Sequence, residues 1–147
     1  MSFVKITRTR DSDLPLPSYE SAGAAGMDVR AYVEHKTFTL KPMDRCLIPA
    51  AFAVEIPLGY EIQIRPRSGL ALKHGVTMVN APGTIDSDYR GEIGIILINM
   101  GKNDYTVQHG DRIAQMVLAP VTRCMWTESE ELTETERGQS GFGSTGN

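Results

Sequence analysis

The sequence predicts a single all-β domain, folded as a sandwich or a barrel. Short runs with the alternation of β-strands recur along most of the 147 residues, and turns containing proline or glycine separate them. No run has the periodicity and length of an ordinary amphipathic helix. A chain of this length is typical of one domain with its own hydrophobic core.

The first half of the chain contains most of the expected strands. They are predicted at residues 3–6, 27–31, 37–40, 45–48, 51–56 and 60–64. Between the first two, residues 14–18 contain two prolines, which disfavour a helix and predict an extended connector. The last of these strands alternates cleanly, with Tyr60, Ile62 and Ile64 on one face.

After this strand, residues 66–69 form a turn that leads into a brief helical segment expected at 70–72, with Ser68 near its start. Arg67, Ser68 and the backbone N–H groups near Gly69 would converge on one point. A guanidinium, a hydroxyl and main-chain N–H groups are suitable donors to an anion. The turn is therefore a candidate anion-binding site.

Residues 83–92, with the sequence GTIDSDYRGE, are expected to form a β-hairpin. Glycine supplies backbone freedom, and Asp and Ser can hydrogen-bond their own main chain in the turn. By itself such a turn is more often an ordinary surface feature. The run that follows, residues 93–98, is apolar on both faces, which predicts a strand at the sandwich centre or one covered by another subunit.

Two more strands are expected at residues 104–107 and 111–118. Gln115 interrupts the apolar run of the second, so it is either hydrogen-bonded within the core or directed at a ligand. The composition then becomes acidic over residues 127–136 and rich in Gly, Ser and Thr over 137–147. Such segments bury too little apolar surface to fold alone, which predicts a disordered terminus. Arg137 and Phe142 are unusual residues for a mere spacer.

Charge and cysteine content exclude several classes of function. A net charge of −3 argues against nucleic acid as a partner, because that binding depends on many Lys and Arg contacts to phosphates. Cys46 and Cys124 lack the spacing of a zinc site or a disulfide framework. The sequence shows no signal peptide and no apolar run of ~18 residues, so we expect a cytoplasmic protein without a membrane partner.

Five segments of the chain resemble, in order, the five motifs of the homotrimeric dUTP diphosphatases, the dUTPases. They are residues 25–31 (AGMDVRA), 65–71 (RPRSGLA), 83–92 with Asn80 just before them, 110–115 (GDRIAQ) and 137–146 (RGQSGFGSTG). Five matches in family order are too many for chance. The departures are small, such as Ser140 where the family commonly has a glycine.

The resemblance implies a distorted jelly roll over residues 1–126, with 127–147 as a flexible C-terminal arm that closes over an active site. It also implies a homotrimer whose active sites are shared between subunits. The implied reaction is Mg²⁺-assisted hydrolysis of dUTP to dUMP and pyrophosphate, which limits uracil in DNA and supplies dUMP for dTMP synthesis.

Residue roles follow from the same resemblance. Asp86 is expected to be the general base that activates a water for attack on the α-phosphorus, since aspartate is ordinarily ionised at neutral pH. Tyr89 would lie against the deoxyribose and exclude a 2′-hydroxyl, although it could instead be a cross-strand packing residue. Uracil would be recognised through main-chain groups and one amide side chain, at Thr84, Ile85, Gly94 and Asn80.

The phosphates would be bound by Arg67, Ser68 and Gly69, and Gln115 resembles the family's α-phosphate contact. Mg²⁺ would bridge phosphate oxygens and keep several waters, so Asp28 fits an outer-shell role through those waters. Asp28 could instead pair with a neighbouring arginine.

The arm would complete the site. Phe142 is expected to stack on the uracil and Arg137 to pair with the terminal phosphate. Gly143 would allow close approach to the ligand, while Ser144 and Thr145 would add hydroxyl donors. A lid of this kind excludes water and strengthens the electric fields acting on the triphosphate.

Two alternatives remain open at this level. A dCTP deaminase shares the jelly roll but would need a carboxylate acting at the base ring; the stretch around Tyr89 and the arm disfavour it. A non-catalytic jelly-roll trimer would explain the sandwich, but not the combination of Asp86, Gln115 and the arm.

Overall fold

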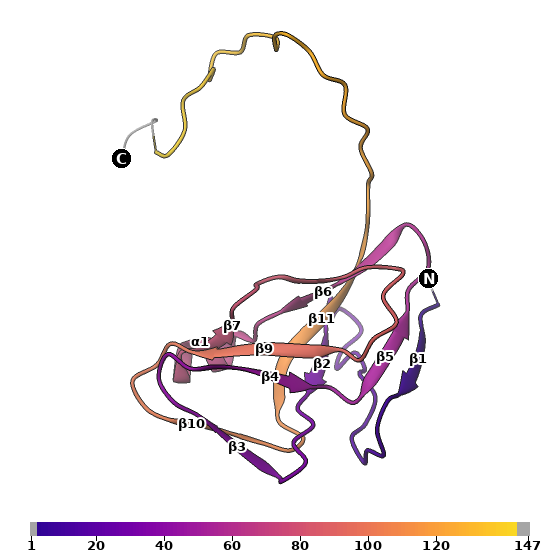
Figure 1. Ribbon diagram of the computed structural model, residues 1–147, viewed down its shortest axis with the longest axis vertical. Coiled ribbons are helices and arrows are strands. Elements are labelled where there is room, and N and C mark those ends of the chain that lie inside the picture. Colours follow the sequence, from indigo (N-terminus) through magenta and orange to yellow (C-terminus); the bar gives the residue numbers. More distant parts are fainter. Residues whose placement is uncertain (1–2, 144–147) are drawn as a thin grey trace.

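The computed structural model describes residues 3–143 as a body of antiparallel β-sheets followed by an extended arm (Figure 1). The strands are β1 (Lys5–Arg8), β2 (Met27–Arg30), β3 (Thr37–Leu40), β4 (Arg45–Pro49), β5 (Phe52–Glu55), β6 (Tyr60–Arg65), β7 (Val76–Met78), β8 (Gly83–Ile85), β9 (Gly94–Asn99), β10 (Tyr105–Gln108) and β11 (Arg112–Pro120). The all-β prediction is confirmed, and the expected strands match to within a few residues. The first strand is shifted furthest, because its position is decided by pairing with β5.

Two sheets enclose the core. One has the order β2-β11-β6-β8 and the other β4-β9-β7, while β1–β5 and β10–β3 form two-stranded ribbons. The buried cluster takes Ile62 and Ile64 from β6, Ile95 and Leu97 from β9, and Met116 from β11. Burial of these side chains against one another supplies the hydrophobic free energy that holds the sheets together.

The polar face of β6 is organised by its own side chains. Gln63 donates to Glu61 at 2.7 Å, and Arg65 donates to Gln63 at 2.8 Å. Ile62 and Ile64 are buried on the opposite face. The predicted alternation of this strand is therefore confirmed, and β6 forms a stiff support between β11 and β8.

The helix α1 (Ser68–His74) is longer than the brief turn expected from the sequence. Ser68 lies at its start, but Arg67 occupies the cap position and no side chain caps the helix. The helix ends at Gly75, whose φ of 69° is left-handed and whose N–H donates to the carbonyl of Ala71. The helix thus holds Arg67, Ser68 and Gly69 at its N-terminal end.

The stretch 83–92 is not a β-hairpin, which corrects the prediction. β8 pairs with β6, whereas β9 pairs with β4 and β7. The stretch therefore carries the chain from one sheet to the other. Turn residues favour a local reversal of the chain, but they do not decide which strand each arm pairs with. β9 is the middle strand of its sheet, with Ile95 and Leu97 buried on one face and Ile96 and Ile98 part-buried on the other. Of the two predicted placements, the sandwich centre and cover by another subunit, the second stays a prediction.

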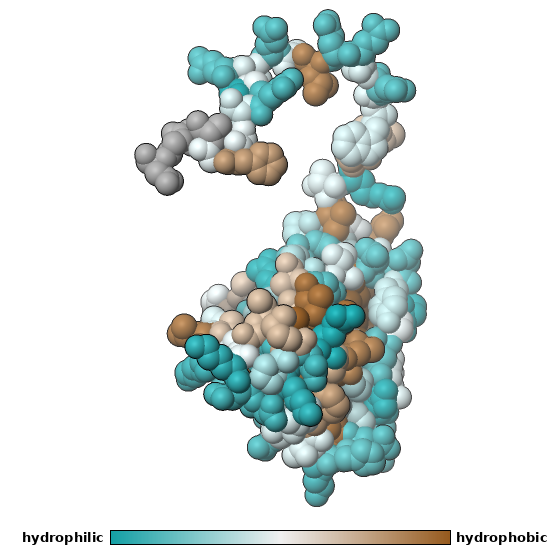
Figure 2. Space-filling model, turned by 60° about the vertical axis from the view of Figure 1, so that its left-hand side comes forward, coloured by the Kyte–Doolittle hydropathy of each residue, from teal (hydrophilic) through white to brown (hydrophobic). Residues whose placement is uncertain are grey.

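Beyond Pro120 the chain leaves the body. Residues 121–143 contain no helix or strand, and nearly all of them are exposed. The first residues of this segment still touch the body, because the N–H of Val121 donates to the carbonyl of Gly59 at 2.9 Å and Val121 and Arg123 line a hollow there. Figures 1 and 2 show the rest of the segment standing clear of the body. No helix within the described chain is long and apolar enough to span a membrane.

Candidate active site

A hollow of about 240 Å³ opens beside the loop that joins β8 to β9. Five of its lining residues were predicted from the sequence, namely Thr84, Ile85, Asp86, Tyr89 and Gly94. Three were not, namely Leu47, Glu92 and Ile96. Leu47 reaches the hollow because β4 pairs with β9, a pairing between distant segments that no local pattern indicates.

The loop is shaped around Tyr89. The main-chain N–H of Tyr89 donates to the carbonyl of Asp86 at 3.1 Å, and its hydroxyl donates to the carbonyl of Glu92 at 3.1 Å. A Cβ at Gly91 would overlap the Tyr89 ring, so this position requires glycine. Tyr89 lies outside the strands, so cross-strand packing does not account for it.

Asp86 is exposed at the junction of two hollows, because it also lines a second one of about 480 Å³. None of the ion pairs within residues 3–143 involves it. Its carboxylate is therefore accessible to water. Asn80 lines neither hollow but lies beside the start of β8, with its amide nitrogen 3.4 Å from the position that a Cβ of Gly83 would take.

A second group of predicted residues gathers where β2 and β11 meet the start of α1. Asp28 contacts Arg67 at 3.1 Å and Arg112 at 3.3 Å. Gln115 lies opposite Asp28 in the sheet and donates to the carbonyl of Pro66 at 3.1 Å. Ser68 and Gly69 are exposed in the first turn of α1. Two guanidinium groups against one carboxylate leave this group net positive, which favours an anion.

The environment of Asp28 limits how it can hold a metal ion. Its carboxylate already pairs with two arginines, as one of the alternatives predicted. Residues 3–143 contain no cluster of three or more His, Cys, Asp or Glu side chains that could bind a metal. A carboxylate that already pairs with two arginines is poorly placed to bind a metal ion directly, so Asp28 would contact a Mg²⁺ ion at most through water.

The two groups lie at opposite ends of β6. Ile85 pairs with Ile62 near one end of the strand, and Gln115 pairs with Arg65 at the other. One further step in this register places Asp86 opposite Glu61. Glu61 is four positions before Arg65, which pairs with Gln115. Because a strand rises ~3.3 Å per residue, the two groups are about 13 Å apart along the sheet.

The described part of the arm, residues 127–143, does not contact either group in this structure. Arg137 donates to the carbonyl of Ser140 within the arm, and Phe142 is fully exposed. Gly143 has a φ of 81°. Ser144 and Thr145 lie outside the described residues.

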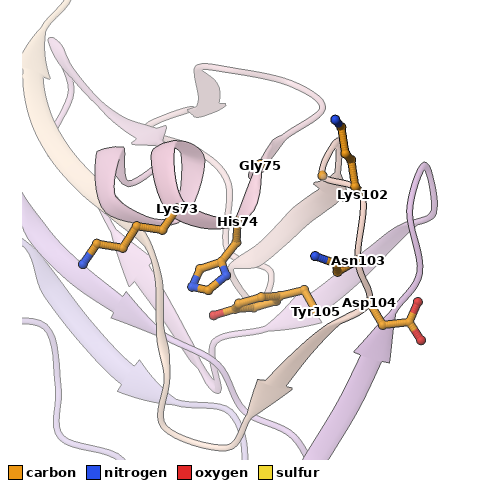
Figure 3. Close-up of a pocket in the computed structure, with 8 residues that line it drawn as sticks. Lys73, His74, Gly75, Lys102, Asn103, Asp104 and Tyr105 are labelled. Atoms are coloured by element: carbon orange, nitrogen blue, oxygen red, sulfur yellow. The ribbon is translucent and has the colours of Figure 1, made fainter.

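A further hollow of about 220 Å³ lies between the end of α1 and residues 101–105 (Figure 3). It gathers none of the predicted residues. Lys73, Lys102 and Asp104 point in different directions, and the His74 ring packs 5.0 Å from that of Tyr105. The side chains do not converge on a ligand, so this hollow is not a candidate site.

A family model described as dUTPase matches residues 12–146. The chain belongs to the dUTPase family. A relative from Desulfotalea psychrophila, named deoxyuridine 5'-triphosphate nucleotidohydrolase, is 58% identical over 99% of this chain and 97% of its own length. A relative of the same name from Caulobacter vibrioides is 57% identical over 92% of this chain and 88% of its own.

The fold of this dUTPase-family chain agrees with that of solved structures. The structure of Staphylococcus bacteriophage 80alpha dUTPase with dUPNHPP is 26% identical and covers 100% of both chains, with a TM-score of 0.85. The predicted distorted jelly roll is confirmed.

Proposed function

We propose that this chain hydrolyses dUTP to dUMP and pyrophosphate at active sites shared between the copies of a homotrimer. Its membership of the dUTPase family makes it a dUTP diphosphatase. The proposal that copies share their active sites is supported by one observation, the separation of the two residue groups along β6. A base must lie within hydrogen-bonding reach of the water it activates, and that water must contact the α-phosphorus. Asp86 and Gln115 of one copy, about 13 Å apart along the sheet, are too far from each other to act on one phosphate.

A cyclic trimer resolves this difficulty. In a head-to-tail interface each copy offers one surface to one neighbour and a different surface to the other. The loop carrying Asp86 in one copy would then meet the phosphate-binding group of the next copy. Each of the resulting sites would contain one complete set of residues.

In the reaction, Asp86 accepts a proton from the attacking water as its oxygen bonds to the α-phosphorus. The bond from the α-phosphorus to the bridging oxygen breaks, and pyrophosphate leaves. Arg67, Ser68 and the N–H of Gly69 neutralise and orient the phosphates, while Gln115 holds the α-phosphate. A bound Mg²⁺ would offset further phosphate charge, with Asp28 contacting it through water.

The hollow beside the loop would bind the nucleoside. Tyr89 would pack against the deoxyribose, leaving no room for a 2′-hydroxyl, while Leu47 and Ile96 supply apolar walls. The uracil edge would be matched by groups at Thr84, Ile85, Gly94 and Asn80. Cytosine reverses one donor and one acceptor, so buried groups would lose their partners at a cost of about 1–3 kcal/mol each.

Residues 127–147 would act as a lid on the β body, to which residues 121–126 connect them. The exposed position of Phe142 supports this role, because an unpartnered aromatic ring gains by stacking on a base. Arg137 would pair with the terminal phosphate, and Gly143, Ser144 and Thr145 would close around the triphosphate. Ordering the arm costs conformational entropy, which the ligand contacts offset.

One experiment separates the proposed activity from its alternatives. The protein is incubated with Mg²⁺ and dUTP, dCTP, dTTP or UTP, and both pyrophosphate and ammonia are followed. We expect pyrophosphate from dUTP and ammonia from none of the four. Ammonia from dCTP would establish a deaminase instead, and neither product from any substrate would indicate a non-catalytic protein.

A further inference from the structure

Glu92 connects the nucleoside hollow to the N-terminal segment. Its carboxylate accepts two hydrogen bonds from the Arg10 guanidinium, both at 2.8 Å, and a third from the Thr9 hydroxyl. Its main-chain carbonyl accepts the Tyr89 hydroxyl at 3.1 Å. One residue thus ties the loop to a segment 82 positions away in the sequence.

Arg10 is held on its other side as well. Its guanidinium lies 5.3 Å from the centre of the Tyr32 ring. That ring meets His109 edge-on at 5.3 Å. His109 is fixed in turn, because one ring nitrogen lies 2.8 Å from the Asp13 carboxylate and the other accepts the N–H of Val33 at 3.1 Å. The guanidinium therefore has a defined position from which to hold Glu92.

The contact is forked and joins a part-buried carboxylate to an exposed guanidinium. The Glu92 side chain is 23% exposed and that of Arg10 is 42% exposed. The Arg10 guanidinium keeps the pKa of the Glu92 carboxyl below its usual value, and the Thr9 hydroxyl acts in the same direction. A forked arginine–carboxylate contact also fixes orientation, which a single hydrogen bond does not. The contact thus fixes the orientation of the Glu92 side chain. The main chain that follows is held separately, because the N–H of Ile93 donates to the carbonyl of Phe52 and its carbonyl accepts the N–H of Ala50, both at 2.9 Å.

We infer that the Arg10–Glu92 pair is a latch that positions Tyr89 and thereby sets the discrimination between deoxyribo- and ribonucleotides. This inference rests on the proposed packing of Tyr89 against the sugar. Tyr89 is 44% exposed, and the one hydrogen bond of its hydroxyl within residues 3–143 goes to the main-chain carbonyl of Glu92, the residue whose side chain the latch holds. Movement of Glu92 would shift the ring and admit a 2′-hydroxyl. Arg10 precedes residue 12, where the match to the family model begins.

The test compares Arg10→Met and Glu92→Gln with a matched control, Lys5→Met. Lys5 also lies in the N-terminal segment and pairs with Glu55 at 2.9 Å, but this pair lies outside the loop. Each variant is assayed for kcat and KM with dUTP and with UTP. We expect the dUTP-to-UTP ratio of kcat/KM to fall roughly three- to ten-fold in Arg10→Met and Glu92→Gln, and to stay at the wild-type value in Lys5→Met.

Two further readouts separate positioning from general destabilisation. The Arg10→Met/Glu92→Gln double variant should lose no more discrimination than either single variant, because both remove one interaction. Amide hydrogen exchange over residues 86–92 should accelerate in Arg10→Met relative to Lys5→Met, and this measurement does not depend on activity. An unchanged dUTP-to-UTP ratio of kcat/KM in Arg10→Met would overturn the inference, whatever rate of amide hydrogen exchange is measured. Absence of pyrophosphate release from dUTP by the wild type would instead refute the proposed function.

Discussion

The distance between the two residue groups predicts how mixtures of inactive variants behave. Asp86→Asn removes the proposed base at one end of β6, and Gln115→Ala removes the proposed phosphate contact at the other. Each variant alone is expected to lose at least about ten-fold in turnover, with the larger loss for the base. Four residue steps at ~3.3 Å separate the two positions along the sheet, so the proposed shared site takes them from different copies.

The expected recovery follows from symmetry. When the two variants are unfolded together in equal amounts and refolded, a site is intact if one copy contributes Asp86 and its neighbour contributes Gln115. Random assembly of a cyclic trimer gives this arrangement at about a quarter of the sites. Pyrophosphate release from dUTP should therefore return to about a quarter of the wild-type rate per site. Native mass spectrometry would verify that mixed trimers have formed.

The matched control mixes Arg67→Ala with Gln115→Ala. These residues belong to the same group at the start of α1 and the facing part of β11, so one copy must supply both. No mixture of them contains an intact site, and we expect no recovery. Absence of recovery in the Asp86→Asn and Gln115→Ala mixture, or equal recovery in the control, would refute the shared site.

Three further outcomes are expected. Asp86→Asn should retain dUTP binding in calorimetry while kcat falls about 10²- to 10⁴-fold, and an unchanged kcat would remove Asp86 as the base. Truncation after Glu136 should leave the β body folded by circular dichroism and sharply lower kcat/KM; wild-type kcat/KM would reduce the arm to a spacer. Asn99→Leu should lower the free energy of unfolding by about 2–4 kcal/mol in urea titrations, because the buried Asn99 side chain satisfies main-chain groups of Leu40, Gly101 and Asn103. A loss below about 1 kcal/mol would contradict that account.

Local signals in the sequence were sufficient for most of the strands. Alternation located β6, because one side of that strand faces the core and the other faces solvent. Similarly, the polar Gln115 within an apolar run marked a residue with a specific partner, which the structure shows to be the carbonyl of Pro66. These features depend on neighbours along the chain, so they can be seen without knowledge of the fold.

Pairing between distant segments was not predictable in this way. The stretch 83–92 has the composition of a hairpin turn, yet β8 and β9 enter different sheets. In the same way, nothing near Glu92 in the sequence indicates that Arg10 will hold its carboxylate. Both depend on which strands and segments exchange hydrogen bonds, and this is decided by packing of the whole core.

The sequence alone determined the all-β class, the position of most strands and, through its five motifs, which residues are candidates for the site. Only the tertiary structure decided where those residues stand relative to one another. The registers of β8 and β11 against β6 set Asp86 and Gln115 at opposite ends of one strand. Register is a property of long-range hydrogen bonding, so the separation that points to shared sites emerges only when the chain is folded.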